Sequence, residues 1–405
     1  MNRFVTIALC VAAVGSMSAQ KAVVDQAGKL AGKIDQLGNA RNLIKQAIEN
    51  PETAQDARTY FTAGKIEFDA FDKAEVNKAI NPSDPSAQPE VMGEELLNGY
   101  KYFLKALPLD SVPDEKGKIK PKYSKDIYSK IAGHANNFFG VGADYFNAKK
   151  YYPEAYEAFM IYGDLPSSGM LGKAAALIPE EQVATSYFNA GLAAYQGNAV
   201  EESANAFKKA RQAGYDKDEA YIYEIACWQN LAQKDEARAA ESQQKIMEVA
   251  QAGYDKFGME QPIFFNNIVN SLVLDGKTQE ALSKLDAAIS ANPDNAGLYG
   301  LRGYVYDRAE DDEKSEADYR KAASIPNVDF ETLKNASKKI FRIGTTKWDK
   351  IEGNSDEAKA ARQNVKANYF DVSKKIADQA KGMNPTDGDL QSLMESIDYV
   401  LTTYF

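Results

Sequence analysis

The feature that most restricts how this chain can fold is a pattern of apolar and small residues that occurs three times with the same internal spacing, the last two copies lying 34 positions apart. The first half of the pattern occurs at Tyr187–Gly191–Ala194, Phe265–Val269–Leu272 and Tyr299–Gly303–Tyr306. The second half begins twelve residues after the middle residue of the first, at Ser203–Phe207–Ala210, Ala281–Leu285–Ala288 and Ser315–Tyr319–Ala322. A fixed period of this length indicates stacked structural repeats, each of which buries its apolar face against its neighbours.

Each half of the pattern has the spacing of an α-helix with one buried face, because its apolar residues recur three, four and seven positions apart. Turn residues separate the two halves at Gly197–Asn198 and Asp275–Gly276. Pro293 and Pro326 follow the second half, where a proline cannot continue the helix. We therefore predict an all-α chain made of antiparallel helix pairs.

These residues resemble the tetratricopeptide repeat, and the resemblance is strongest in Tyr187–Tyr215 and Phe265–Asn295. It implies an α-solenoid, in which stacked helix pairs form a right-handed superhelix with a groove for partner proteins. We expect four regions along the chain. They are a signal peptide at 1–20, an N-terminal helical region of degenerate units at 21–183, the repeat array at 184–327, and long helices with a capping helix at 328–405.

Two insertions interrupt the repeat rhythm, at Leu107–Lys125 and Asp164–Gln182. Connections of this length within a repeat array are either functional or serve to cover the neighbouring layer. We interpret them as structural cover.

The first twenty residues have the pattern of a signal peptide. Arg3 supplies the positive charge, Phe4–Val14 is apolar but too short to span a bilayer, and small residues lead to cleavage after Ala19 or Gln20. We therefore expect an exported chain in the periplasm, with secretion or association with the outer membrane as alternatives. Cleavage would remove Cys10 and leave Cys227 as a single thiol, so no internal disulfide is expected.

Charge and composition narrow the range of partners and chemistry. The formal net charge is -10, and an acidic surface repels nucleic acid. No segment after the signal region is apolar enough to predict a transmembrane helix. With one histidine, His134, and one cysteine after cleavage, the sequence excludes a His/Cys metal site within one chain. We expect no catalytic site, metal or cofactor, and we interpret His134 as a satisfied histidine at a helix end. The acidic stretch Asp307–Glu313 lacks the central glycine of a calcium loop, so we interpret it as a solvated turn.

The resemblance implies that the first helix of each pair lines the groove. Its exposed positions give these candidate partner-binding residues: Phe188, Leu192, Tyr195, Asn266, Asn270, Leu274, Tyr304, Asp307 and Arg308. Packing between layers is an equal alternative for Phe188 and Leu192. The positions at which related proteins hold a C-terminal carboxylate with Lys and Arg are mostly apolar or Asn here, so that mode is not expected.

The leading functional hypothesis is a non-enzymatic scaffold in the cell envelope that binds a partner protein or peptide, with envelope or secretion proteins as the expected partners. The alternative is a binder of a small molecule or glycan that serves an outer-membrane uptake system. That alternative requires an exposed tryptophan platform, for which Trp228 and Trp348 are the two candidates. A hydrolase would need a histidine or a metal that the sequence does not provide.

Overall fold

The structure is a computed structural model that describes residues 21–33 and 36–405, and all regular elements in these ranges are helical. The expected signal peptide, 1–20, lies outside the described residues. The chain divides into two compact units, one ending at Lys245 and the other running from Ile246 to Phe405. The division falls within α11 (Ala239–Phe257), so the expected array at 184–327 is shared between the two units.

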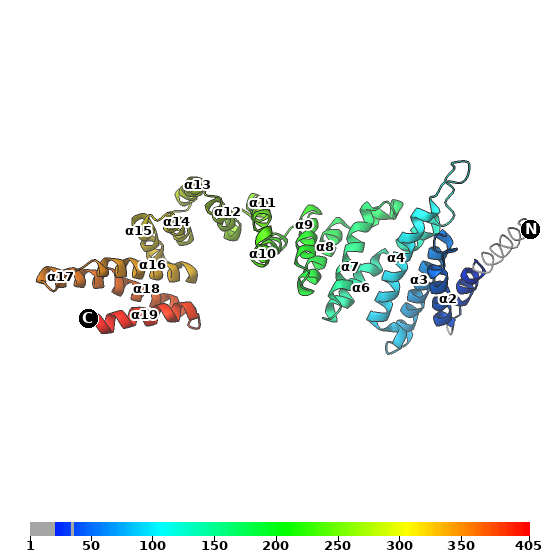
Figure 1. The fold of residues 1–405 in the computed structure, drawn as a ribbon, viewed down its shortest axis with the longest axis horizontal. Helices are drawn as coiled ribbons and strands as arrows, with labels where there is room; N and C mark the ends of the chain where they lie inside the picture. The colour runs from blue at the N-terminus through cyan, green and yellow to red at the C-terminus, as the bar shows by residue number, and fades with distance from the viewer. Residues whose placement is uncertain (1–20, 34–35) are drawn as a thin grey trace, which may run out of the picture. The chain divides into compact units, whose positions relative to one another are not determined.

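In the first unit, helices follow one another in chain order and pack on their neighbours (Figure 1). A helix over residues 21–31 is followed by α2 (Leu37–Glu49), α3 (Ala57–Ile80), α4 (Pro89–Asp110), α5 (Ser124–Gly133), α6 (Ala135–Asn147), α7 (Tyr152–Asp164), α8 (Glu180–Gln196), α9 (Val200–Gln212) and α10 (Glu219–Lys234). Connections of a few residues, such as the one between α8 and α9, force successive helices to run in opposite directions.

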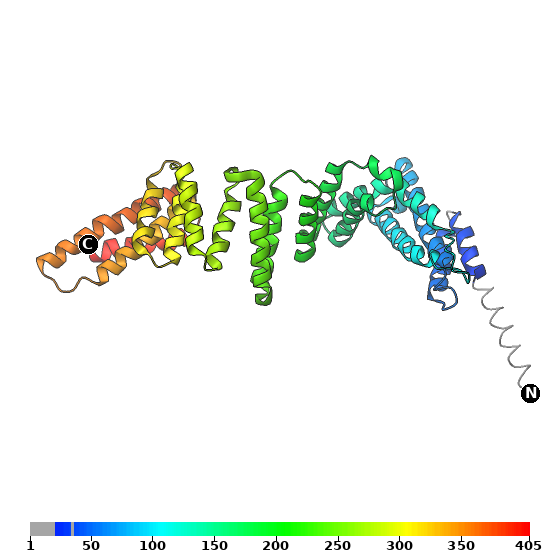
Figure 2. The same ribbon diagram turned by 90° about the horizontal axis from the view of Figure 1, so that it is seen from above.

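The second unit contains α12 (Pro262–Leu274), α13 (Thr278–Ala291), α14 (Ala296–Arg308), α15 (Asp312–Ser324), α16 (Phe330–Asp349), α17 (Asp356–Val365), a π-helical turn (Lys366–Phe370), α18 (Asp371–Met383) and α19 (Gly388–Tyr404). Figure 2 shows these helices from a second direction. The first helices of the pairs begin at Pro262, Ala296 and Phe330, which are separated by equal steps of one repeat period. The repeat register therefore continues into α16, beyond the expected end of the array at 327.

A recurring hydrogen bond explains the spacing between the two halves of the sequence pattern. Ser203 Oγ of α9 donates to the carbonyl oxygen of Gly191 in α8 at 2.8 Å, and Ser315 Oγ of α15 donates to that of Gly303 in α14 at 2.9 Å. All four residues are buried, so each hydroxyl satisfies its hydrogen-bonding capacity inside the pair. The small residue lets the two helices approach closely enough for this bond to form.

Aromatic rings fill the space that small residues leave open. A Cβ atom on Gly191 would lie 2.6 Å from the ring of Phe207, which is far closer than real contacts allow. Gly64 in α3 receives the ring of Phe103 in α4 in the same way. The same ring-on-glycine contact therefore recurs in two helix pairs of the first unit.

The predicted insertion at 107–125 is shorter than expected, because α4 continues to Asp110 and α5 begins at Ser124. The carboxylate of Asp110 explains why the end of α4 and the start of α5 lie close together. It accepts hydrogen bonds from the backbone N–H groups of Lys122, Tyr123 and Ser124 at 2.8 to 2.9 Å, which ties the start of α5 to the end of α4. Burial acts to raise the pKa of Asp110, but these hydrogen bonds hold it below its usual value.

The second insertion, 164–182, contains two short 3-10 helices, Leu165–Ser167 and Gly172–Leu177, before α8 begins at Glu180. Leu165 and Leu171 are buried in the core of the first unit. This segment therefore covers a helical layer, which is the structural role interpreted from the sequence.

Candidate partner-binding cleft

A cleft of about 810 Å³ opens on the second unit along the first helices of its pairs. Asn266 and Asn270 line it from α12, Tyr304 from α14, and Thr332 and Asn335 from α16. Its volume falls in the range of sites that hold ligands. The turns that precede α14 and α16 also contribute lining residues, so one end of the cleft lies at the start of these two helices.

The repeat explains why these side chains share one surface. Helices that begin one repeat period apart present the same face to the cleft, so Asn270 and Tyr304 occupy equivalent positions in α12 and α14. Gly300 stands where α12 carries Asn266, and a Cβ there would lie 2.8 Å from the Cγ2 atom of Thr332. The missing side chain therefore lets α14 and α16 meet closely beneath the cleft.

Helix pairs that begin one repeat period apart and line a cleft with their first helices form an all-α solenoid. This arrangement is the one that the resemblance to tetratricopeptide repeats predicts.

Comparisons with solved structures find tetratricopeptide-repeat proteins at low similarity. The chain is similar to YrrB, described as a tetratricopeptide-repeat protein with an unusual peptide-binding site. The two share 17% identity over 52% of this chain and 96% of that one, with a TM-score of 0.35. A tetratricopeptide-repeat protein from Bacteroides fragilis shares 16% identity over 66% of this chain and 98% of that one, with a TM-score of 0.32. No family model matches the sequence, and no curated protein matches it.

Four polar side chains of this cleft have no hydrogen-bond partner among the described residues. Within the described residues, no hydrogen bond to the chain occupies the side-chain amides of Asn266, Asn270 and Asn335 or the hydroxyl of Tyr304. An amide offers both donors and an acceptor, and therefore matches the alternating N–H and C=O groups of an extended peptide. Tyr304 is 36% exposed and adds a rigid ring next to the amides.

The structure thus brings together three of the nine predicted site residues, Asn266, Asn270 and Tyr304. Leu274 and Arg308 stand exposed at the C-terminal ends of α12 and α14 and do not line the cleft.

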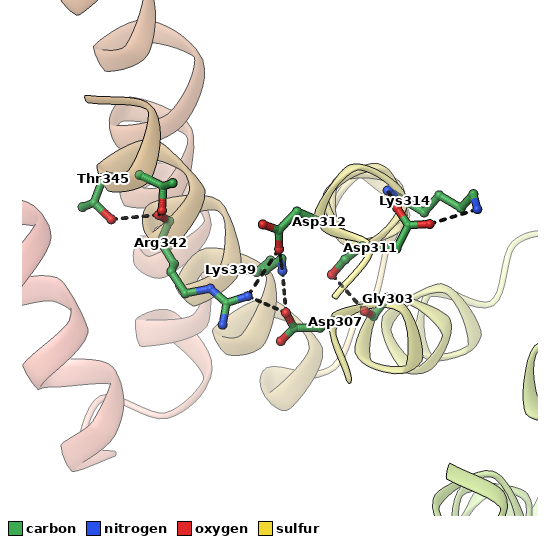
Figure 3. A network of polar contacts seen from close by, with 10 residues as sticks. Gly303, Asp307, Asp311, Asp312, Lys314, Lys339, Arg342 and Thr345 are labelled. Atoms are coloured by element: carbon green, nitrogen blue, oxygen red, sulfur yellow. Dashed lines mark hydrogen bonds and ion pairs between the residues drawn. The ribbon is translucent and has the colours of Figure 1, made fainter. Parts of the chain in front are cut away.

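Asp307 takes part in a network of ion pairs with two cations of α16 (Figure 3). The ammonium group of Lys339 contacts the carboxylates of Asp307 and Asp312, and Arg342 also pairs with Asp307. The Lys339 side chain is 3% exposed, so these carboxylates compensate a buried charge. The prediction that Asp307–Glu313 forms a solvated turn was therefore wrong for Asp307, which lies in α14 and joins it to α16, whereas Asp312 pairs with Lys339 from an exposed position.

The remaining predicted residues, Phe188, Leu192 and Tyr195, belong to the first unit. The ring of Phe188 stacks on that of Tyr215, with 4.4 Å between centroids and 9° between planes, and it also contacts Phe207. Leu192 lines a small cavity of about 180 Å³, and Tyr195 is exposed at the end of α8. Phe188 therefore packs inside the first unit.

Sequence reasoning missed the contribution of α16, which supplies Thr332 and Asn335 to the cleft. The sequence did indicate that the repeat extends into α16, because Val269, Gly303 and Ser337 are separated by equal steps of one repeat period. Ser337 is fully buried and accepts a hydrogen bond from Ser373 Oγ at its carbonyl oxygen at 2.9 Å, as Gly303 does from Ser315.

The described part of the chain contains no cluster of three or more His, Cys, Asp or Glu side chains suited to a metal ion. His134 lies between α5 and α6, with Nε2 2.6 Å from Asp72 Oδ1 and Nδ1 2.7 Å from the carbonyl oxygen of Lys130. Its ring also meets Phe68 edge-on. His134 is therefore a satisfied histidine at a helix end, as predicted.

Neither tryptophan offers an open platform for a sugar ring. Trp228 is buried in α10. Trp348 is covered by Phe405 and Tyr404, whose ring centroids lie 4.9 and 5.6 Å away, and by the guanidinium group of Arg362 at 5.5 Å. The exposed tryptophan that the glycan-binding alternative requires is therefore not present, because other side chains of the chain cover both tryptophan rings.

Among residues 21–33 and 36–405, none of the helices combines the length and apolar character needed to cross a membrane.

Proposed function

We propose that this chain is a non-enzymatic scaffold of the cell envelope that holds an extended segment of a partner protein in the cleft between α12, α14 and α16. The observation that carries the proposal is the row of free amides at Asn266, Asn270 and Asn335 beside Tyr304. Free polar side chains in a preformed cleft can pair with a peptide backbone without first breaking bonds within the protein.

The mode of binding follows from the chemistry of these groups. Amides that bind backbone atoms give affinity that is independent of most of the partner's side chains, while the ring of Tyr304 provides an apolar contact. The cleft lies along the first helices of stacked pairs, so a bound segment crosses from α12 to α16.

Photocrosslinking in cells tests the partner and the surface together. A photoreactive amino acid at Asn270 or Tyr304 should give discrete crosslinked proteins by mass spectrometry. The control position is Ser283, which is exposed on α13 and does not line the cleft. Equal yields from Asn270, Tyr304 and Ser283 would contradict the proposal.

Export rests on the signal-peptide pattern of residues 1–20. Intact-mass measurement of the protein purified from its native cells should show a chain that begins at Gln20 or Lys21, in the periplasmic fraction. A chain that retains Phe4–Val14 and stays with the cytoplasm would remove the envelope from the proposed function.

A further inference from the structure

We propose that the segment held in the cleft is basic, an internal extended stretch that carries lysine or arginine side chains. This inference rests on the proposed function and adds the chemical class of the partner. It excludes acidic segments and chain ends that bind through a free carboxylate.

The charged side chains that line the cleft are all acidic. They are Asp294, Asp329 and Glu331, and no lysine, arginine or histidine lines the cleft in the part of the chain that the structure describes. Asp294 precedes α14 and Asp329 precedes α16, so these carboxylates lie in the equivalent turns of two successive repeats.

The chain compensates these charges only in part. Asp329 accepts hydrogen bonds from the backbone N–H and the hydroxyl of Thr332 at 2.9 and 2.6 Å, both of which are neutral donors. The N-terminus of α16 carries a partial positive charge, which offsets part of the negative charge of Asp329. Lys334 pairs with Glu331 at 3.0 Å but is shared with Asp387 at 3.3 Å.

Asp294 forms no ion pair or hydrogen bond with its side chain within the described residues, and it is exposed. The turns at the start of α14 and α16 therefore keep a negative charge beside the free amides. An extended segment that binds the amides through its backbone would neutralise this charge with a basic side chain, whereas an acidic side chain would be repelled.

A peptide selection tests this charge preference. Random decapeptides displayed on phage are selected against the full chain, and peptides that also bind the Asn266→Ala/Asn270→Ala variant are removed. The expected result is that the peptides that remain are enriched in Lys and Arg.

The matched variant is Asp294→Asn/Asp329→Asn/Glu331→Gln, which removes the charges while keeping the side-chain shapes. Asn at 329 preserves the helix cap, and the unfolding curve of the variant checks that the fold is retained. A selected basic peptide should bind this variant about tenfold more weakly at low ionic strength, and the difference should shrink as salt is added.

The outcomes separate the two proposals. Cleft-dependent peptides without an excess of basic residues, or unchanged binding to the charge-neutral variant, would overturn the inference and leave the peptide-binding function in place. A selection that yields no peptide dependent on Asn266 and Asn270 would overturn both.

Discussion

The ring of Phe159 in α7 lies 2.8 Å from the position that a Cβ atom on Gly142 of α6 would occupy. We therefore expect Gly142→Ala to lower the free energy of unfolding by about 1 to 3 kcal/mol, because the buried ring or the helix must move. Urea denaturation measures this change. Gly140→Ala in the same helix is the control, since a Cβ there meets no atom within 4 Å. It should stabilise the protein by up to about 1 kcal/mol. Equal effects of the two substitutions would contradict the packing argument.

Substitution of the buried Lys339 should destabilise the fold more than substitution of its exposed neighbour Lys338. Lys339→Met removes a cation that contacts Asp307 and Asp312, and should lower the free energy of unfolding by roughly 2 to 3 kcal/mol. Lys338→Met, at an exposed position of the same helix, should change it by less than about 0.5 kcal/mol. A double-mutant cycle with Asp307→Asn measures the coupling. Additive effects would show that the two side chains do not interact.

The same network predicts how stability depends on pH. Burial acts to raise the pKa of Asp307, but hydrogen bonds and charge from Lys339 and Arg342 hold it below its ordinary value of 3.8. A carboxyl group whose pKa is lower in the folded state stabilises the fold above its unfolded pKa, and this stabilisation is lost as the pH falls through the folded value. The stability difference between wild type and Asp307→Asn should therefore be constant from about pH 7 to 5 and shrink below about pH 4. Urea titrations at each pH measure this stability difference. A difference that grows as the pH falls would contradict a lowered pKa for Asp307.

Removal of the two amides of α12 should affect binding but not folding. With the photoreactive amino acid at Tyr304, Asn266→Ala/Asn270→Ala should reduce the crosslinking yield by about tenfold. The two amides would no longer form hydrogen bonds with the backbone of the bound segment. The free energy of unfolding of this double variant should change by less than about 0.5 kcal/mol, since neither side chain bonds to the described chain. Gln279→Ala, exposed on α13, is the control for both measurements. A loss of yield in the control as well would point to a general effect on the protein.

Cys227 should be chemically inert in the folded protein. Its thiol is fully buried, and burial raises its pKa to about 11, so little reactive thiolate forms at neutral pH. In a Cys10→Ser background, a thiol reagent at pH 8 should label Cys227 only after denaturation. Labelling of the folded protein at the rate of a free thiol would show that α10 opens readily.

The helix pairs could be predicted because Gly191, Ser203 and Phe207 carry the contacts that hold one pair together, and their spacing is visible in the sequence. The third pair of the second unit could not be found in this way. Its serines, Ser337 and Ser373, lie 36 residues apart, whereas Ser203 lies 12 residues after Gly191. The intervening α17 and π-helical turn separate the two helices of that pair, so the second half of the pattern does not occur at the expected position.

For the cleft, the groove positions implied by the resemblance to tetratricopeptide repeats were sufficient to identify Asn266, Asn270 and Tyr304. Asp307 was misjudged because its cationic partner, Lys339, lies 32 residues further along the chain, and long-range ion pairs leave no local pattern. The acidic turns at Asp294 and Asp329 were missed for a related reason. Their position in the cleft depends on how successive pairs stack.

On α12 and α14, residues that build the stack lie next to residues that line the cleft. Val269 and Gly303 hold their pairs together, while the adjacent Asn270 and Tyr304 point into the cleft. Under the proposed function, substitutions at Asn270 and Tyr304 therefore change the binding surface while the architecture stays intact. A chain of this design could be redirected to new targets, in evolution or in the laboratory, by editing a few surface positions spaced one repeat apart.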